Sequence, residues 1–315
     1  MSAKLLEGAV GKVANSWLPN ILGSPLLFWL GVFIAWVYSL DDNWREFVGW
    51  FSGLPDTSQF IAITLAVSLM ITSDFMVQQL ERPILRFLEG YWPGWSLPVW
   101  RWCIKRINQQ QIALKQELIK RLTENPKDSE THDASRRIAL EQKIAQLPTN
   151  FENDRINRYL MPTRLGNRLR AYERKSYEKY GLDAVICWPR LWLLLPDSVK
   201  LDLTAARNDL DAATRLWIWG VLFIACTGLN GLALPIGLLV AALAYDGWML
   251  PAAEIYGILI EATFDTQRHQ LYEALGLPRP PSRDDEYAYG QQLTNYLRGD
   301  KFDEIQCDRN SPPTS

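Results

Sequence analysis

Residues 216–245 read LWIWGVLFIACTGLNGLALPIGLLVAALAY and contain no charged side chain. A bilayer core takes roughly 20 apolar residues of helix, so this stretch is too long for one upright span. Asn230-Gly231 is a strong turn signal near its middle. The stretch therefore predicts two spans, 212–229 and 232–250, joined by a tight turn. One long tilted helix is the alternative.

Two further stretches, 13–40 and 57–73, also lack charged residues. They predict spans at 21–40 and 57–77. We therefore expect an all-α, multi-pass membrane protein with four transmembrane helices in two hairpins and a helical cytoplasmic region. The first transmembrane hairpin is expected over 1–79, and an interfacial and helical cytoplasmic region follows over 80–211. The second transmembrane hairpin is expected over 212–250, and a cytoplasmic helix with an acidic tail over 251–315.

Charge orients these spans. Residues 80–214 hold 23 basic and 17 acidic side chains, whereas the loop 41–56 has only Arg45 against four acidic residues. Basic segments stay on the cytoplasmic side of a membrane. This bias places 80–214 and both chain termini in the cytoplasm. The tail 246–315 has 6 basic and 12 acidic residues, so it could dock on the basic region.

The region between the hairpins begins with a Trp- and Pro-rich segment, 82–102, whose composition is typical of the membrane interface. Apolar residues at helical spacing then predict amphipathic helices at 101–122 and 134–147. A polar turn separates them, so an antiparallel, coiled-coil-like hairpin is expected. Such a hairpin offers a surface for a homo-oligomer or a cytoplasmic protein partner. Acidic residues interleave throughout, which argues against nucleic acid as a partner.

Few residues point to reaction chemistry. The four cysteines have no paired spacing, and His132 and His269 are far apart. No arrangement typical of a nucleophile, a phosphate loop or a metal site stands out. We expect neither a metal nor another cofactor, and no enzymatic activity, although lipid modification stays open.

Three charged residues fall close to span ends. Asp74 and Asp246 lie near the inner ends of the second and fourth spans, and Arg215 begins the third. Ionisable groups in a bilayer usually face a partner or water, so these three form a candidate functional cluster. The alternative is that each reaches interfacial water independently.

Short motifs are concentrated between residues 159 and 196, among them Pro162-Thr-Arg-Leu-Gly-Asn167 and Trp188-Pro-Arg-Leu191. On these motifs the chain resembles a family of uncharacterised bacterial multi-pass membrane proteins. The resemblance covers roughly 159–280 and implies location in the plasma (inner) membrane, without implying an activity.

Three arginines of this region, Arg164, Arg168 and Arg174, share part of one face if the segment is helical. That face could hold lipid phosphate or the acidic tail. The alternative is that Arg164 pairs with a local carboxylate and orders the loop.

Two function classes follow from these features. The first is an integral membrane scaffold or signalling protein that binds through its cytoplasmic helical region. The second is an oligomeric ion channel, because the order of spans and helical segments is similar to that of bestrophin-like channels. That similarity is one of topology alone.

Overall fold

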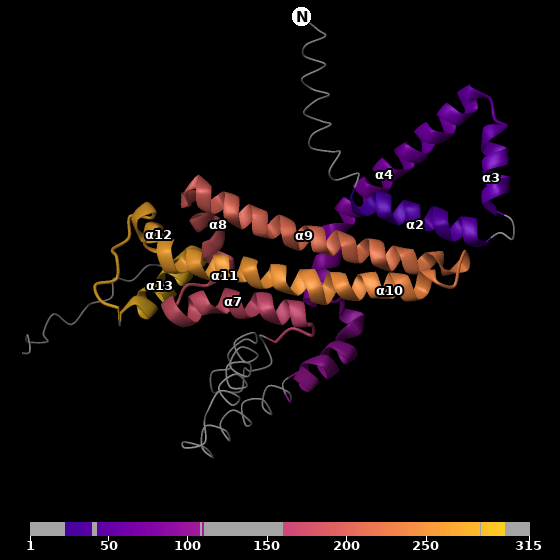
Figure 1. The fold of residues 1–315 in the computed structure, drawn as a ribbon. Helices are drawn as coiled ribbons and strands as arrows, with labels where there is room; N and C mark the ends of the chain where they lie inside the picture. Colours follow the sequence, from indigo (N-terminus) through magenta and orange to yellow (C-terminus); the bar gives the residue numbers. More distant parts are fainter. Residues whose placement is uncertain (1–22, 40–42, 108, 110–159, 284, 300–315) are drawn as a thin grey trace, which may run out of the picture. The chain divides into compact units, whose positions relative to one another are not determined.

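The computed structural model describes residues 23–39, 43–107, 109, 160–283 and 285–299 (Figure 1). These residues are predominantly helical, with no strand among them, which confirms the predicted all-α class. The chain divides into two compact units. Unit 1 comprises Met1–Phe87 and Asn208–Ala252, and unit 2 comprises Leu88–Arg207 and Ala253–Ser315.

Unit 1 begins with the helices α2 (Ser24–Ser39) and α3 (Asn43–Ser52), followed by α4 (Asp56–Glu89). Aromatic side chains hold α3 against α2, with the Phe33 and Phe47 rings 5.2 Å apart. The Trp29 indole of α2 also donates a 2.9 Å hydrogen bond to Ser73 of α4.

Helix α4 is longer than its apolar part. It passes the predicted span end at residue 77 and continues through Pro83, although a proline inside a helix removes one hydrogen bond. The break falls instead at Gly90, whose φ of 101° favours glycine. The segment predicted to be interfacial from residue 82 is therefore helical up to Glu89, and a 3-10 turn (Gly94–Ser96) and a helix over 97–107 follow.

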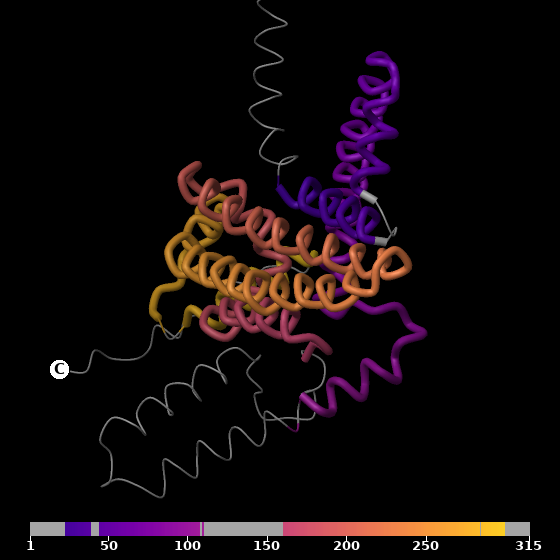
Figure 2. The backbone as a smooth tube through the Cα atoms, turned by 45° about the vertical axis from the view of Figure 1, so that its right-hand side comes forward, coloured from indigo at the N-terminus to yellow at the C-terminus, as the bar shows by residue number. Residues whose placement is uncertain are grey.

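The third charge-free stretch forms a helical hairpin. Helix α9 (Asp197–Ala225) and a 3-10 turn (Cys226–Gly228) lead to Asn230, whose side chain accepts a 2.9 Å hydrogen bond from the Leu232 amide. Helix α10 (Ala233–Leu243) then returns beside the end of α9 (Figure 2). The two helices lie very close together here. A Cβ added to Gly220 would lie only 2.8 Å from the Ala241 amide nitrogen. The chain thus turns at Asn230-Gly231, and 212–250 is not one helix.

Three helical stretches of the described chain are long and apolar enough to cross a membrane: Asp56–Ile107, Asp197–Gly228 and Ala233–Gln267. In the last of these the charge-free part precedes Asp246. Helix α2, at the position of the predicted first span, has only 16 residues. At 1.5 Å per residue it is shorter than a bilayer core of about 30 Å.

Unit 2 packs α7 (Arg164–Tyr180) and α8 (Ala184–Leu194) with α11 (Leu250–Gln267), α12 (His269–Ala274) and α13 (Glu286–Arg298). Thr163 caps α7 by accepting a 3.1 Å hydrogen bond from the Gly166 amide, and Gly181 ends the helix with a φ of 69°. The core of this unit is fully buried at Leu182, Cys187, Leu191, Phe264, Leu271, Tyr272 and Leu293.

Ion pairs join α7 to α11. Lys175 and Lys179 donate to Glu261 at 2.7 and 2.8 Å, and the Tyr180 hydroxyl donates to Asp265 at 2.7 Å. Burial alone raises the pKa of Glu261, but the two lysine hydrogen bonds outweigh burial and lower it below its ordinary value.

The predicted antiparallel hairpin of 101–122 and 134–147 lies outside the described residues, apart from its first turns within the helix 97–107.

Candidate functional site

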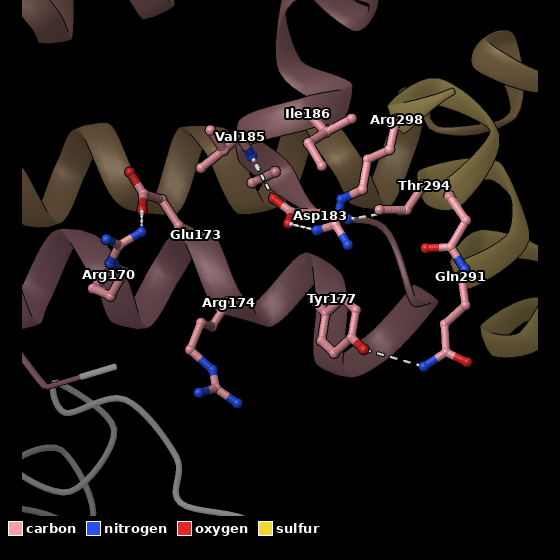
Figure 3. Close-up of a pocket in the computed structure, with 12 residues that line it drawn as sticks. Arg170, Glu173, Arg174, Tyr177, Asp183, Val185, Ile186, Gln291, Thr294 and Arg298 are labelled. Carbon is pink, nitrogen blue, oxygen red and sulfur yellow. Dashed lines mark hydrogen bonds and ion pairs between the residues drawn. The ribbon is translucent and has the colours of Figure 1, made fainter. Parts of the chain in front are cut away.

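A polar cavity of about 580 Å³ opens in unit 2 between α7, the start of α8 and α13 (Figure 3). Its wall is formed by residues far apart in the sequence: Arg170, Glu173, Arg174, Tyr177, Asp183, Ala184, Val185, Ile186, Gln291, Thr294, Asn295 and Arg298. Charged and hydrogen-bonding groups dominate this wall, so its chemistry suits a polar or charged ligand.

One wall follows from the helical period of α7. Arg170, Glu173, Arg174 and Tyr177 are spaced i, i+3, i+4 and i+7, so they share a face. The opposite face of α7 carries buried residues such as Tyr172. Packing of that face on the rest of unit 2 turns the charged face toward the cavity.

A hydrogen-bonded corner fixes the other wall. The Asp183 carboxylate caps α8 by accepting from the Val185 amide at 3.0 Å, and it accepts from the Arg298 guanidinium at 2.8 Å. The Asp183 amide donates to the Thr294 hydroxyl at 3.1 Å, and that hydroxyl donates to the Gly181 carbonyl at 3.0 Å. These bonds join the end of α7, the start of α8 and α13 into one corner.

Charges of both signs line the cavity. Arg170 donates to Glu173 at 3.3 Å and to the Tyr91 hydroxyl at 3.2 Å. Burial raises the pKa of Glu173, against the lowering effect of the Arg170 charge, and Asp183 raises it further. Three guanidinium groups and two carboxylates in one wall can pair with a ligand that carries both charges.

The three arginines predicted as one binding face do not meet at a single site. Arg164 is exposed at the first turn of α7. Arg168 pairs with Glu254 at 3.4 Å, and Arg174 pairs with Glu178 at 3.2 Å while lining the cavity. Arg174 thus pairs within its own helix, whereas Arg168 pairs with a carboxylate of α11.

The predicted cluster of Asp74, Arg215 and Asp246 belongs to unit 1. Asp74 is only 7% exposed, accepts a 2.8 Å hydrogen bond from Gln78, and lies close enough to Arg215 for electrostatic attraction. Asp246 is exposed in a π-helical segment, Ala244–Met249. Of the predicted cluster, Asp74 and Arg215 therefore lie close enough for their charges to attract.

The polar stripe of α4 is exposed on the single chain. Thr64, Ser68 and Thr72 each donate to the carbonyl four residues earlier, at 2.8 Å. Ser73 of the same helix bonds another helix, because its hydroxyl accepts from the Trp29 indole.

Within the residues that the structure describes, no group of three or more His, Cys, Asp or Glu side chains could hold a metal ion. Burial raises the pKa of the Cys187 thiol to about 12, so this cysteine carries almost no reactive thiolate at neutral pH. The cavity wall itself offers ion pairing and hydrogen bonding, the chemistry of binding.

No protein-family model, curated protein or solved structure matches this chain. The resemblance drawn from its short motifs stays a prediction.

Proposed function

We propose that this protein is an integral membrane scaffold or signalling protein whose unit 2 binds a cytoplasmic protein partner. The observation that carries the proposal is the cavity bounded by α7, α8 and α13. Its walls are set by bonds within a unit that has its own core. A preformed, charged recess of this kind is suited to recognition, since a binding site that is already ordered loses less entropy on association.

Three apolar helical stretches support residence in a membrane. We place four spans in two hairpins in the plasma (inner) membrane, with α2 as a short first span around which the bilayer thins. The basic excess of 80–214 puts unit 2 and both termini in the cytoplasm. In this arrangement the charge-free parts of α4, α9 and α10 hold the binding unit at the membrane.

The charges of the wall define the partner. Arg170, Arg174 and Arg298 stand beside Glu173 and Asp183, so a polypeptide segment with both basic and acidic side chains matches the cavity. Electrostatic complementarity of this kind mainly provides specificity and fast association.

A photo-crosslinking amino acid at Asn295, an exposed residue of the wall, tests the scaffold in native membranes. We expect a stoichiometric adduct with one protein, absent when the same amino acid replaces Leu201, which is exposed outside the wall. Arg174→Gln should reduce the adduct about tenfold, the loss of one charged hydrogen bond. Arg283→Gln, an exposed arginine outside this cavity, is the matched control.

Adducts formed only between two copies of the chain would contradict the scaffold and favour self-association. An adduct with a different protein that is equally strong in Arg174→Gln would also contradict the proposed site.

A second candidate, an oligomeric ion channel, rests on Asp74. A nearly buried carboxylate in an apolar helix near an arginine is a functional hypothesis in its own right. Purified protein in liposomes should then conduct ions, and Asp74→Asn should alter the flux whereas Asp56→Asn, at the exposed start of α4, should not. A verified oligomer that conducts nothing would rule the channel out.

A further inference from the structure

The segment 94–107, which we call the tryptophan-arginine segment, displays large apolar side chains to the outside. It consists of the 3-10 turn Gly94–Ser96 and the helix over 97–107. Trp95 is 83% exposed and Trp102 is 60% exposed, and Leu97 and Val99 are about half exposed. Exposed apolar surface of this size in one short segment marks a contact with lipid or protein.

The segment has an inner and an outer face. Ser96 and Ile104 are buried, and Ser96 donates a 2.7 Å hydrogen bond to the Pro93 carbonyl. One face of the segment is therefore buried within the chain. Since the inward face is already covered, Trp95 and Trp102 remain available to an external surface.

Basic side chains surround the exposed indoles. Arg101, Lys105 and Arg106 are exposed, and the Arg106 guanidinium lies over the Trp102 ring at 5.5 Å from its centroid. No acidic residue occurs between Glu89 and Glu117. This face is therefore positively charged, unlike the ion-paired surfaces of α7 and α11.

Indole rings and basic side chains together match one environment, the headgroup layer of an anionic membrane. An indole places its apolar body among acyl chains and its N–H among headgroups. Arginine and lysine gain from negatively charged lipids. The segment also ends the helical stretch Asp56–Ile107, which is long and apolar enough to cross a membrane.

We infer that the tryptophan-arginine segment is a lipid-binding surface that inserts Trp95 and Trp102 into an anionic leaflet. The arginines and lysine bind lipid phosphate around them. This inference concerns a surface separate from the cavity wall, so it holds whether or not the cavity binds a partner.

Spin labelling of the full-length protein in nanodiscs tests this inference. A label at Val99→Cys reports the segment, and a label at Arg283→Cys is the control on an exposed loop. Cys103, Cys226 and Cys307 are replaced by serine, whereas Cys187 can stay because it is fully buried. The label at 99 should collide more with oxygen than with a water-soluble nickel complex, and the label at 283 should show the reverse.

The lipid composition tests the charge. Nanodiscs with phosphatidylglycerol should bury the label at 99 more deeply than nanodiscs of phosphatidylcholine alone. Replacing Arg101, Lys105 and Arg106 by glutamine should abolish that difference. Each charge removed should weaken the partition of the segment into the membrane about fivefold. Unlabelled Cys187 in each variant verifies that unit 2 is still folded.

Three results would overturn the inference. Nickel access at 99 equal to that at 283 would place the segment in water. Protection at 99 from both reagents would indicate coverage by protein, either a partner or a second copy. If the depth of the label at 99 does not depend on phosphatidylglycerol, the basic residues have no role in lipid binding.

Discussion

Unit 1 and unit 2 contain similar apolar residues and use them differently. In unit 2, Leu191 and Phe264 are fully buried in a core of their own. In unit 1, Phe60 is 72% exposed and Leu65 is 64% exposed, and one small buried cluster consists of Val77, Ile218 and Trp219. Apolar composition alone therefore does not indicate a protein core.

The difference shows which medium stabilises each unit. Side chains that face outward from α4 lose contact with water only if lipid or another protein covers them. Unit 2 already removes its apolar side chains from water within the chain. Unit 1 thus leaves apolar surface for lipid or another protein to cover, whereas unit 2 covers its own apolar side chains by packing.

A pair of phenylalanine substitutions gives the largest expected contrast. Phe264→Ala should destabilise unit 2 by about 3–5 kcal/mol, because it opens a cavity in a packed core. Phe60→Ala in unit 1 should cost less than about 1 kcal/mol in nanodiscs, since lipid fills the space. Alkylation of the buried Cys187 as a function of denaturant measures the unfolding of unit 2. Equal losses in the two variants would refute the contrast.

Glycine packing gives the next largest effect. A Cβ on Gly290 would collide with the Tyr180 carbonyl oxygen, so Gly290→Ala should force α13 away from α7 at a cost of about 1–3 kcal/mol. Gly247→Ala is the matched control because no atom lies within 4 Å of its added Cβ. Thermal unfolding in nanodiscs measures both, and a wild-type midpoint for Gly290→Ala would contradict the packing described here.

The α7–α11 ion pairs add a smaller, pH-dependent term. Because the folded pKa of Glu261 is lowered, its contribution is present above the unfolded pKa and is lost as the pH falls through the folded value. Both partners are partly exposed, with 31% of the Lys175 side chain and 18% of Glu261 accessible, so we expect about 1 kcal/mol. Glu261→Gln should flatten the acid side of the stability profile. If the stability of Glu261→Gln falls as steeply at acid pH as that of the wild type, other carboxylates cause the pH dependence.

The turn of unit 1 should contribute least. Asn230→Ala removes the hydrogen bond to the Leu232 amide, which an exposed turn partly replaces with water, so the expected cost is about 0.5 kcal/mol. Reporter fusions before and after the turn, together with the unfolding midpoint, measure the effect. Loss of the membrane-inserted hairpin would show that the turn contributes more than the α9–α10 contact at Gly220.

Charge-free stretches predicted the apolar helices and the turn at Asn230-Gly231. The helices extend beyond these predicted spans, because a charged residue limits an apolar span and does not end a helix. Helix α9 begins at Asp197, well before residue 212, since Leu203, Ala206 and Leu210 repeat at helical spacing and are buried. Its polar half is an amphipathic helix that hydropathy alone does not register.

The cavity was harder to predict. The spacing of Arg170 to Tyr177 indicates one charged helical face, and Arg174 was among the candidate residues. Asp183 and Arg298 lie more than a hundred residues apart, and only the packing of α13 on α7 and α8 brings them together. No pattern within a short window carries that information.

The bond between Asp183 and Arg298 also determines the order in which parts of the protein can fold during synthesis. Helix α13 is made only after the apolar segments of α9 and α10 have left the ribosome. At 5–20 residues per second, the hundred or so residues after α7 take about 5–20 seconds to synthesise. During that interval the face of α7 that packs on α13 is uncovered, so the helices α9 and α10 are complete before unit 2 can finish folding. A chaperone that protects α7 would act in that interval.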